Sequence, residues 1–266
     1  MERLSISMGP SEEGPRPEPV EGPRPEPVEG PRPEPVEGPR PEPVEGLAAL
    51  LAGIKTGDSE RVRMLLDQQP DLVGGSGQDG DTPLLLAAYY HADGIVQLLL
   101  ERGASVSLFE AAVIGDIQRV RQTLDDQPEL LLTISHDGWT PLHLAAHFGR
   151  LAVLDLLLAR GAEVDARSTN ALVDTPLHAA LAGGRRATAQ RLVEHGADVN
   201  AVEAGGYTPL HQAADLGDAE MTRMLLERGA RSDVQTDDHF TPQQLARANG
   251  HAALAEMLGR QADGSA

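Results

Sequence analysis

The chain has 266 residues, of which 40% are hydrophobic and 3% aromatic, and it carries a formal net charge of −19. That charge repels nucleic acid and anionic membranes, and the absence of cysteine excludes a disulfide framework, a thiolate zinc site and a cysteine nucleophile. The low aromatic content favours a thin, alanine-rich solenoid over a globular domain.

Two features of composition bear on source and location. There is one lysine, Lys55, against 21 arginines, a bias that indicates a GC-rich genome and hence a bacterial source. No segment approaches the roughly 20 apolar residues of a membrane span, and residues 1–10 lack the apolar core of a leader peptide. We therefore predict a cytoplasmic protein.

Residues 1–46 form a distinct first segment. The octapeptide Gly-Pro-Arg-Pro-Glu-Pro-Val-Glu occurs four times without change between Gly14 and Glu45. Three prolines in eight residues oppose helix and sheet, so we predict an extended, disordered tail. The segment could be a ligand for a proline-recognition domain, but its Pro-x-Pro-x-Pro spacing favours a linker grown by tandem duplication. A true start downstream of Met1 stays open.

The segment after the tail predicts a first pair of helices. Leu50 and Leu51 lie in the first helix, Asp58 can cap the second, and Val62 begins the apolar stripe of the second. The unit lacks the motif that marks the later units, as expected of a terminal unit with one face in water.

The clearest helix pair begins at Thr140. Its hydroxyl can cap a helix, and Pro141 suits the first helical position. Gly149 can end this helix in the left-handed conformation, and a second helix is expected over Leu151–Ala159, before Gly161. Such a hairpin cannot bury its apolar face alone and needs neighbouring copies.

The copies are present. Thr-Pro-Leu recurs at Thr82, Thr140, Thr175 and Thr208, Thr-Pro returns at Thr241, and Gly-Ala-x-Val follows the second helix at Gly161 and Gly196. The repeated T-P-L-H-x-A-A and G-A-x-V patterns resemble the ankyrin repeat family. That resemblance implies an all-α solenoid of seven stacked helix-turn-helix repeats with β-hairpin loops, here called fingers. It also implies that the solenoid binds other proteins. It implies repeats at about 47–79, 80–104, 105–137, 138–172, 173–205, 206–238 and 239–262, with 263–266 as a frayed tail.

Two irregularities interrupt the repeat. Residues 47–104 align with 105–162 at a constant offset of 58, so two units were copied as one block. At the join, Ser107 and Glu110 fit a capping box and leave no room for a finger. Conversely, Gly161 and Thr175 are 14 residues apart where the next two units have 12, so that finger carries two extra residues.

The candidate chemistry points away from catalysis. His143, His178 and His211 share one repeat position, which favours one structural role, hydrogen bonding between adjacent loops. No zinc-protease, phosphate-loop or nucleophile-elbow motif occurs. We predict no catalytic, metal or cofactor site. An enzyme or small-molecule binder using the histidine row, and a purely structural spacer, are the alternatives.

The aromatic residues supply the candidate binding site. The resemblance places most of them outside the core, at the ends of first helices or just before the Thr. Val113 and Ile114 extend the first group into an apolar patch, typical of a contact site. We predict a monomer that binds a protein partner with a basic and apolar segment through its concave face, using Tyr89, Tyr90, Val113, Ile114, Trp139, Phe148, Tyr207 and Phe240. For the three residues that precede a Thr, namely Trp139, Tyr207 and Phe240, the alternative is a structural role in packing along the row of hairpins.

Overall fold

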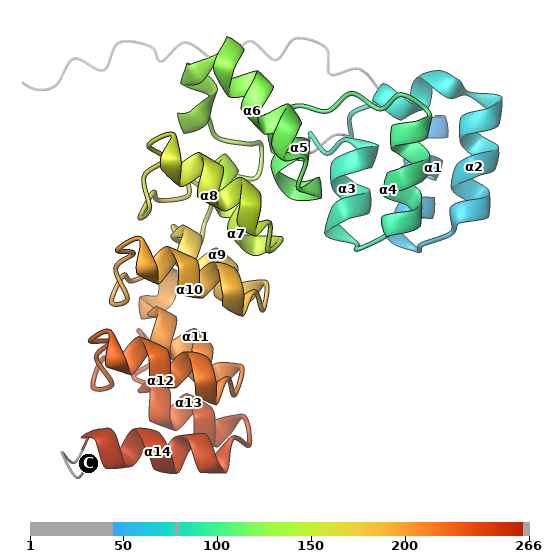
Figure 1. Ribbon diagram of the computed structural model, residues 1–266. Helices are drawn as coiled ribbons and strands as arrows, with labels where there is room; N and C mark the ends of the chain where they lie inside the picture. Colours follow the sequence, from blue (N-terminus) through green and yellow to red (C-terminus); the bar gives the residue numbers. More distant parts are fainter. Residues whose placement is uncertain (1–44, 78–79, 263–266) are drawn as a thin grey trace, which may run out of the picture. The chain divides into compact units, whose positions relative to one another are not determined.

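The computed structural model describes residues 45–77 and 80–262, which fold into paired α-helices with three short 3-10 turns (Figure 1). The helices are α1 (Glu45–Lys55), α2 (Ser59–Gln68), α3 (Pro83–Tyr89), α4 (Asp93–Glu101), α5 (Leu108–Ile114), α6 (Ile117–Asp126), α7 (Pro141–His147), α8 (Leu151–Ala159), α9 (Pro176–Ala182), α10 (Arg186–Glu194), α11 (Pro209–Asp215), α12 (Ala219–Glu227), α13 (Pro242–Ala248) and α14 (Ala252–Ala262). The 3-10 turns are η1 (Pro70–Gly74), η2 (Pro128–Leu132) and η3 (Ala204–Gly206).

The helix boundaries follow from local chemistry. Thr140 caps α7, since its hydroxyl accepts a hydrogen bond from the His143 amide at 3.4 Å, and Pro141 occupies the first helical position. Gly149 follows α7 with φ 71°, in the left-handed region. The second helix of this unit, α8, has the predicted bounds Leu151–Ala159. These local predictions are confirmed.

The helices form two layers. The first helices, α1, α3, α5, α7, α9, α11 and α13, contact one another in that order, and each packs on the second helix of its own unit (Figure 1). Leu142, Leu154 and Leu157 are buried in the core, and Ala145 and Ala146 have no exposed surface. Small side chains at these positions let adjacent first helices approach closely. The architecture is that of an α-solenoid.

The alanine contact predicts the effect of a larger side chain. Ala145→Leu should lower the free energy of unfolding by roughly 1–3 kcal/mol, because it overpacks a buried helix contact. Ala248→Leu is the matched control and should be close to neutral, since Ala248 is exposed on the last first-layer helix. Urea denaturation of both variants measures the difference. Equal losses of stability would show that the two faces are wrongly assigned.

The predicted β-hairpins are wrong within the described residues, because the structure contains no strand there. Each finger is instead a tight loop: the Ser135 amide donates to the Trp139 carbonyl at 2.8 Å, and the equivalent bond closes the later fingers. Adjacent fingers are joined by isolated main-chain bonds, such as Thr169 to Gly138 at 2.9 Å. These contacts are too sparse to form a ladder.

The unit without a finger is also as predicted. Ser107 and Glu110 form a capping box, and α5 begins immediately at Leu108. The fingers on either side meet across this unit: Nε2 of His136 lies 2.8 Å from a carboxylate oxygen of Asp81. The missing finger therefore leaves no gap between its neighbours.

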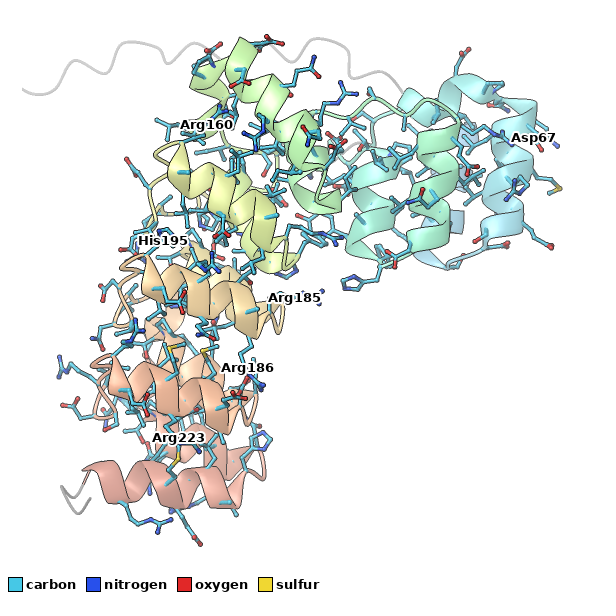
Figure 2. All side chains as sticks on the ribbon, in the orientation of Figure 1. Asp67, Arg160, Arg185, Arg186, His195 and Arg223 are labelled. Carbon is cyan, nitrogen blue, oxygen red and sulfur yellow. The ribbon has the colours of Figure 1, made fainter. Side chains whose placement is uncertain are left out.

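The duplication of residues 47–104 as 105–162 is visible in the ion pairs near the second helices. Asp67 pairs with Arg102 at 2.6 Å, and Asp125 pairs with Arg160, one block later, at 2.7 Å (Asp67 and Arg160 are labelled in Figure 2). Both pairs are partly exposed, so each contributes about 0–1 kcal/mol. Their equivalent positions are therefore evidence of the duplication, and their contribution to stability is small.

The ends of the chain stay as sequence predictions. Residues 1–44 of the predicted tail and the predicted frayed residues 263–266 lie outside the described residues. Helix α1 begins at Glu45, two residues before the predicted boundary at 47.

Candidate functional site

The histidine row connects each unit to the next. Nδ1 of His143 accepts from the Thr140 amide at 3.4 Å, so the ring proton is assigned to Nε2. Nε2 lies 3.2 Å from the Asp174 carbonyl on the following finger. His211 bonds the Phe240 carbonyl in the same way, at 3.1 Å. The predicted hydrogen bonding between loops is confirmed at these two positions.

His178 departs from this pattern. Its Nδ1 lies 2.8 Å from the Thr175 hydroxyl, but Nε2 faces the Tyr207 carbonyl outside normal hydrogen-bond geometry. Burial lowers the pKa of His178 to about 4 and also lowers the pKa of His143 and His211. All three rings are therefore neutral near pH 7.

Two of the predicted binding residues are buried, and a third, Tyr89, is partly buried. Val113 has no exposed surface, and Phe148 is 5% exposed, so the expectation that both face solvent was wrong. Tyr89 packs edge-on against Phe148, with ring centroids 5.0 Å apart, and its hydroxyl donates to the Asp137 carboxylate. Burial raises the pKa of the Tyr89 phenol.

The closed fingers account for the covering of Tyr89. The loop carrying Asp137 folds over the end of α3 and joins the preceding finger through His136 and Asp81. We expected the missing finger to leave the apolar patch open, whereas the neighbouring fingers close over Tyr89, one of its members.

The other predicted residues keep exposed surface. Tyr90 is 51% exposed, and Ile114 lies in a cleft of about 550 Å³ between α4 and the turn after α5, opposite Val96 and Leu100. Phe240 is 43% exposed on its finger.

The finger row combines aromatic rings with acids. Trp139 stacks on His143 at 6.2 Å, and its indole N–H donates to the Asp174 carboxylate at 3.1 Å. Tyr207, at the same finger position two units later, lies 5.9 Å from His211. Trp139 and Tyr207 remain partly exposed.

Two acids that we did not predict lie beside these rings. Asp174 is 2% exposed. Glu203 is half-buried, and its carboxylate accepts a hydrogen bond from the side-chain amide group of Gln212 at 2.9 Å. Burial, reinforced by the Asp174 carboxylate, raises the pKa of Glu203 to about 7. Neither acid forms an ion pair with a residue in the described part of the chain. Asp174 could have been found from the repeat register, since it directly precedes Thr175 as Trp139 precedes Thr140.

Residues 45–77 and 80–262 contain neither a metal-binding cluster nor a membrane-spanning helix. No three His, Asp or Glu side chains there gather in a way that could hold a metal ion. None of the helices in that part of the chain has the length and apolarity to cross a membrane.

Comparison with protein families gives matches over most of the repeats. The model "Ankyrin repeats (3 copies)" matches residues 108–203 and 156–238, and the model "Ankyrin repeat" matches 79–109. Together they span residues 79–238. The first and last helix pairs lie mainly outside these matches, so the count of seven repeats stays a prediction.

Several curated proteins are similar over the same kind of segment. Ankyrin repeat and SAM domain-containing protein 6 of Rattus norvegicus is 31% identical over 117 residues, covering 44% of this chain and 10% of the relative. Alpha-latrocrustotoxin-Lt1a of Latrodectus tredecimguttatus is 29% identical over 119 residues, 42% of this chain and 8% of the relative. Probable E3 ubiquitin-protein ligase XBOS33 of Oryza sativa subsp. japonica is 34% identical over 120 residues, 41% of this chain and 23% of the relative.

The chain thus spans less than a quarter of each of these relatives. All three come from eukaryotes and give no support to a bacterial source.

Proposed function

This chain belongs to the ankyrin repeat family, and on that premise we propose that it is a non-enzymatic module that binds a protein partner through its concave face. The family implies protein–protein interaction. The concave face, formed by the fingers and the exposed parts of the first helices, is our proposal, as is a monomer acting in the cytoplasm.

The observation that carries the proposal is the pairing of aromatic rings with acids that lack a cation. Trp139 and Tyr207 flank Asp174 and Glu203, and neither acid has an ion-pair partner in the described ranges. Asp174 is buried, so Glu203 is the acid that a partner's arginine or lysine can reach, while apolar groups beside that cation pack on the rings. The partner is therefore a basic and apolar segment.

The anchors are revised accordingly. The exposed or partly exposed residues remain in the proposed surface: Tyr90, Ile114, Trp139, Tyr207 and Phe240. Tyr89, Val113 and Phe148 leave it, because the structure needs them in its own packing. The histidine row does not favour the enzyme alternative, since both ring nitrogens of His143 and of His211 are engaged within the protein.

The test uses the full chain and a partner recovered with it from its native host. Glu203→Gln keeps an acceptor for Gln212 but removes the charge, so affinity should fall about tenfold or more by calorimetry. Phe240→Ala should also weaken binding. Glu256→Gln, at an exposed acid on α14, is the matched control and should bind normally. Unchanged affinity in both test variants, with the fold intact by circular dichroism, would place the site elsewhere.

A further inference from the structure

Two consecutive junctions between units are bridged by a polar side chain at one repeat position. A carboxylate oxygen of Asp165 accepts from the Asp198 amide at 2.9 Å. One unit later, the side-chain oxygen of Asn200 accepts from the Arg231 amide at 2.8 Å, and its amide group donates to the Gly229 carbonyl at 3.0 Å. Each bridge ties the loop after one second helix to the loop after the next.

The junction before these two, between the unit of α5 and α6 and the unit of α7 and α8, has a leucine at the bridging position. The bridging position lies three residues before the residue whose amide closes the finger: Asp165 before Ser168, and Asn200 before Glu203. The finger of α7 is closed by Ser135, so the same position is Leu132, which cannot accept a hydrogen bond. By register, the amide left without this bridge is that of Glu163.

A cavity lies where the bridge is missing. It has a volume of about 180 Å³, and its apolar walls include Leu132, Ile134, Leu142, Ala162 and Ala166. At about 30 Å³ for each water molecule, this is room for roughly six waters, or for one bulky apolar side chain. Its lining comes from η2, the finger before α7, the start of α7 and the loop after α8.

The rim exposes apolar surface on a fixed backbone. Leu132 is 61% exposed and Ile134 is 45% exposed. Ser135, next to Ile134, is buried, and both its amide and its hydroxyl donate to the Trp139 carbonyl at 2.8 Å. Covering two such side chains is favourable, and a rigid loop loses little freedom when a partner does so.

The charges around the cavity select the partner. Glu129 is exposed and lies three residues before Leu132 in η2, where side chains three residues apart are eclipsed. Glu163 is exposed on the opposite loop and lines the cavity. Neither acid has an ion pair within residues 45–77 and 80–262. Arg167 also lines the cavity and keeps its positive charge while its Nη1 donates to the Val173 and Val202 carbonyls at 3.1 and 2.5 Å, so the two acids outnumber one base.

We propose that this cavity is a second docking site, separate from the Trp139 surface. Its occupant is a short segment of a partner protein that inserts one leucine-, methionine- or phenylalanine-sized side chain between Leu132, Ile134 and Ala166. Lysine or arginine beside that side chain faces Glu129 and Glu163.

The decisive variant is Leu132→Asp, because it introduces the residue that bridges the next junction. The new carboxylate can accept from the Glu163 amide as Asp165 accepts from Asp198, so the melting temperature should stay the same or rise. The same substitution removes one apolar wall and places a charge in the cavity. Val202→Asp is the matched control: Val202 is also an exposed aliphatic residue on a finger loop, but it does not line the cavity.

The experiment selects displayed random peptides on the full chain. Enriched peptides should carry a large apolar residue with lysine or arginine within three positions. Synthetic copies should lose affinity tenfold or more on Leu132→Asp and bind Val202→Asp normally. The double variant Glu129→Gln/Glu163→Gln should weaken binding severalfold and reduce its dependence on salt.

Three outcomes would overturn the proposal: no enrichment of peptides, peptides that bind the wild type and Leu132→Asp equally, or enriched peptides without basic residues. A wild-type dimer in light scattering that Leu132→Asp converts to a monomer would also overturn it, since the occupant would then be a second copy of the chain.

Discussion

Replacing Phe148 by alanine is expected to lower the free energy of unfolding by about 3–5 kcal/mol, the usual cost of emptying a buried aromatic site. Phe148 is 5% exposed and packs against the rings of Tyr89 and His147, each 5.0 Å away between centroids. Its loss would leave a cavity beside the Tyr89 ring, so unfolding should begin at a clearly lower urea concentration.

Tyr90→Ala is the matched control for this prediction. Tyr90 adjoins Tyr89 in the chain but is 51% exposed, so its truncation should change stability by no more than about 0.5 kcal/mol. If Phe148→Ala were as stable as Tyr90→Ala, Phe148 would return to the set of exposed anchors.

Acidification from pH 7.5 to 4.5 is expected to destabilise the stack through its buried histidines. Burial lowers the pKa of His178 to about 4, while an unfolded histidine titrates near 6.5. As pH falls through 6.5, the unfolded chain binds a proton that the folded chain does not, so stability declines until about pH 4. For His178 alone the loss approaches about 3 kcal/mol, and His143, His147 and His211 shift in the same direction.

Glu203 acts in the opposite sense. Its folded pKa is raised to about 7, so protonation of the folded protein offsets part of the loss as pH falls from 7 toward the unfolded value. The histidines outnumber it, and the net change with acid should be destabilising.

The last unit supplies the control for the histidine prediction. There Gln244 replaces the histidine, and its side-chain oxygen accepts from the Thr241 amide at 2.8 Å. His178→Gln should therefore keep the helix cap while removing the titration. Denaturation curves at several pH values should show a weaker pH dependence for this variant, and curves parallel to those of the wild type would contradict the assignment.

Much of the helical framework could be predicted because its signals are local. The caps at Thr140 and Ser107 depend on residues three positions away, and the stop at Gly149 depends on its own φ. The histidine hydrogen bonds were predictable for a different reason: a residue that is repeated in register is expected to have the same role in each unit. The fingers were predicted less well, since strand pairing depends on how closely neighbouring loops approach.

The candidate site could be predicted only in part. Trp139, Tyr207 and Phe240 occupy the expected row and keep exposed surface, but Val113 and Phe148 do not. In the sequence, Phe148 ends a short helix just as an exposed residue would. Its burial includes packing against Tyr89, two units earlier in the chain, and no local pattern in the sequence predicts that contact.

By itself, the sequence determined the family, the helix pairs, the unit without a finger and the structural role of the histidines, because these follow from caps, periodicity and register. Only the tertiary structure decided which apolar residues face solvent, which acids lack a cation, and that Leu132 opens a cavity where its neighbours form a bridge. Those properties are set by contacts between units, whose residues lie about 30 positions apart or more in the chain, and burial and charge balance exist only once those contacts form.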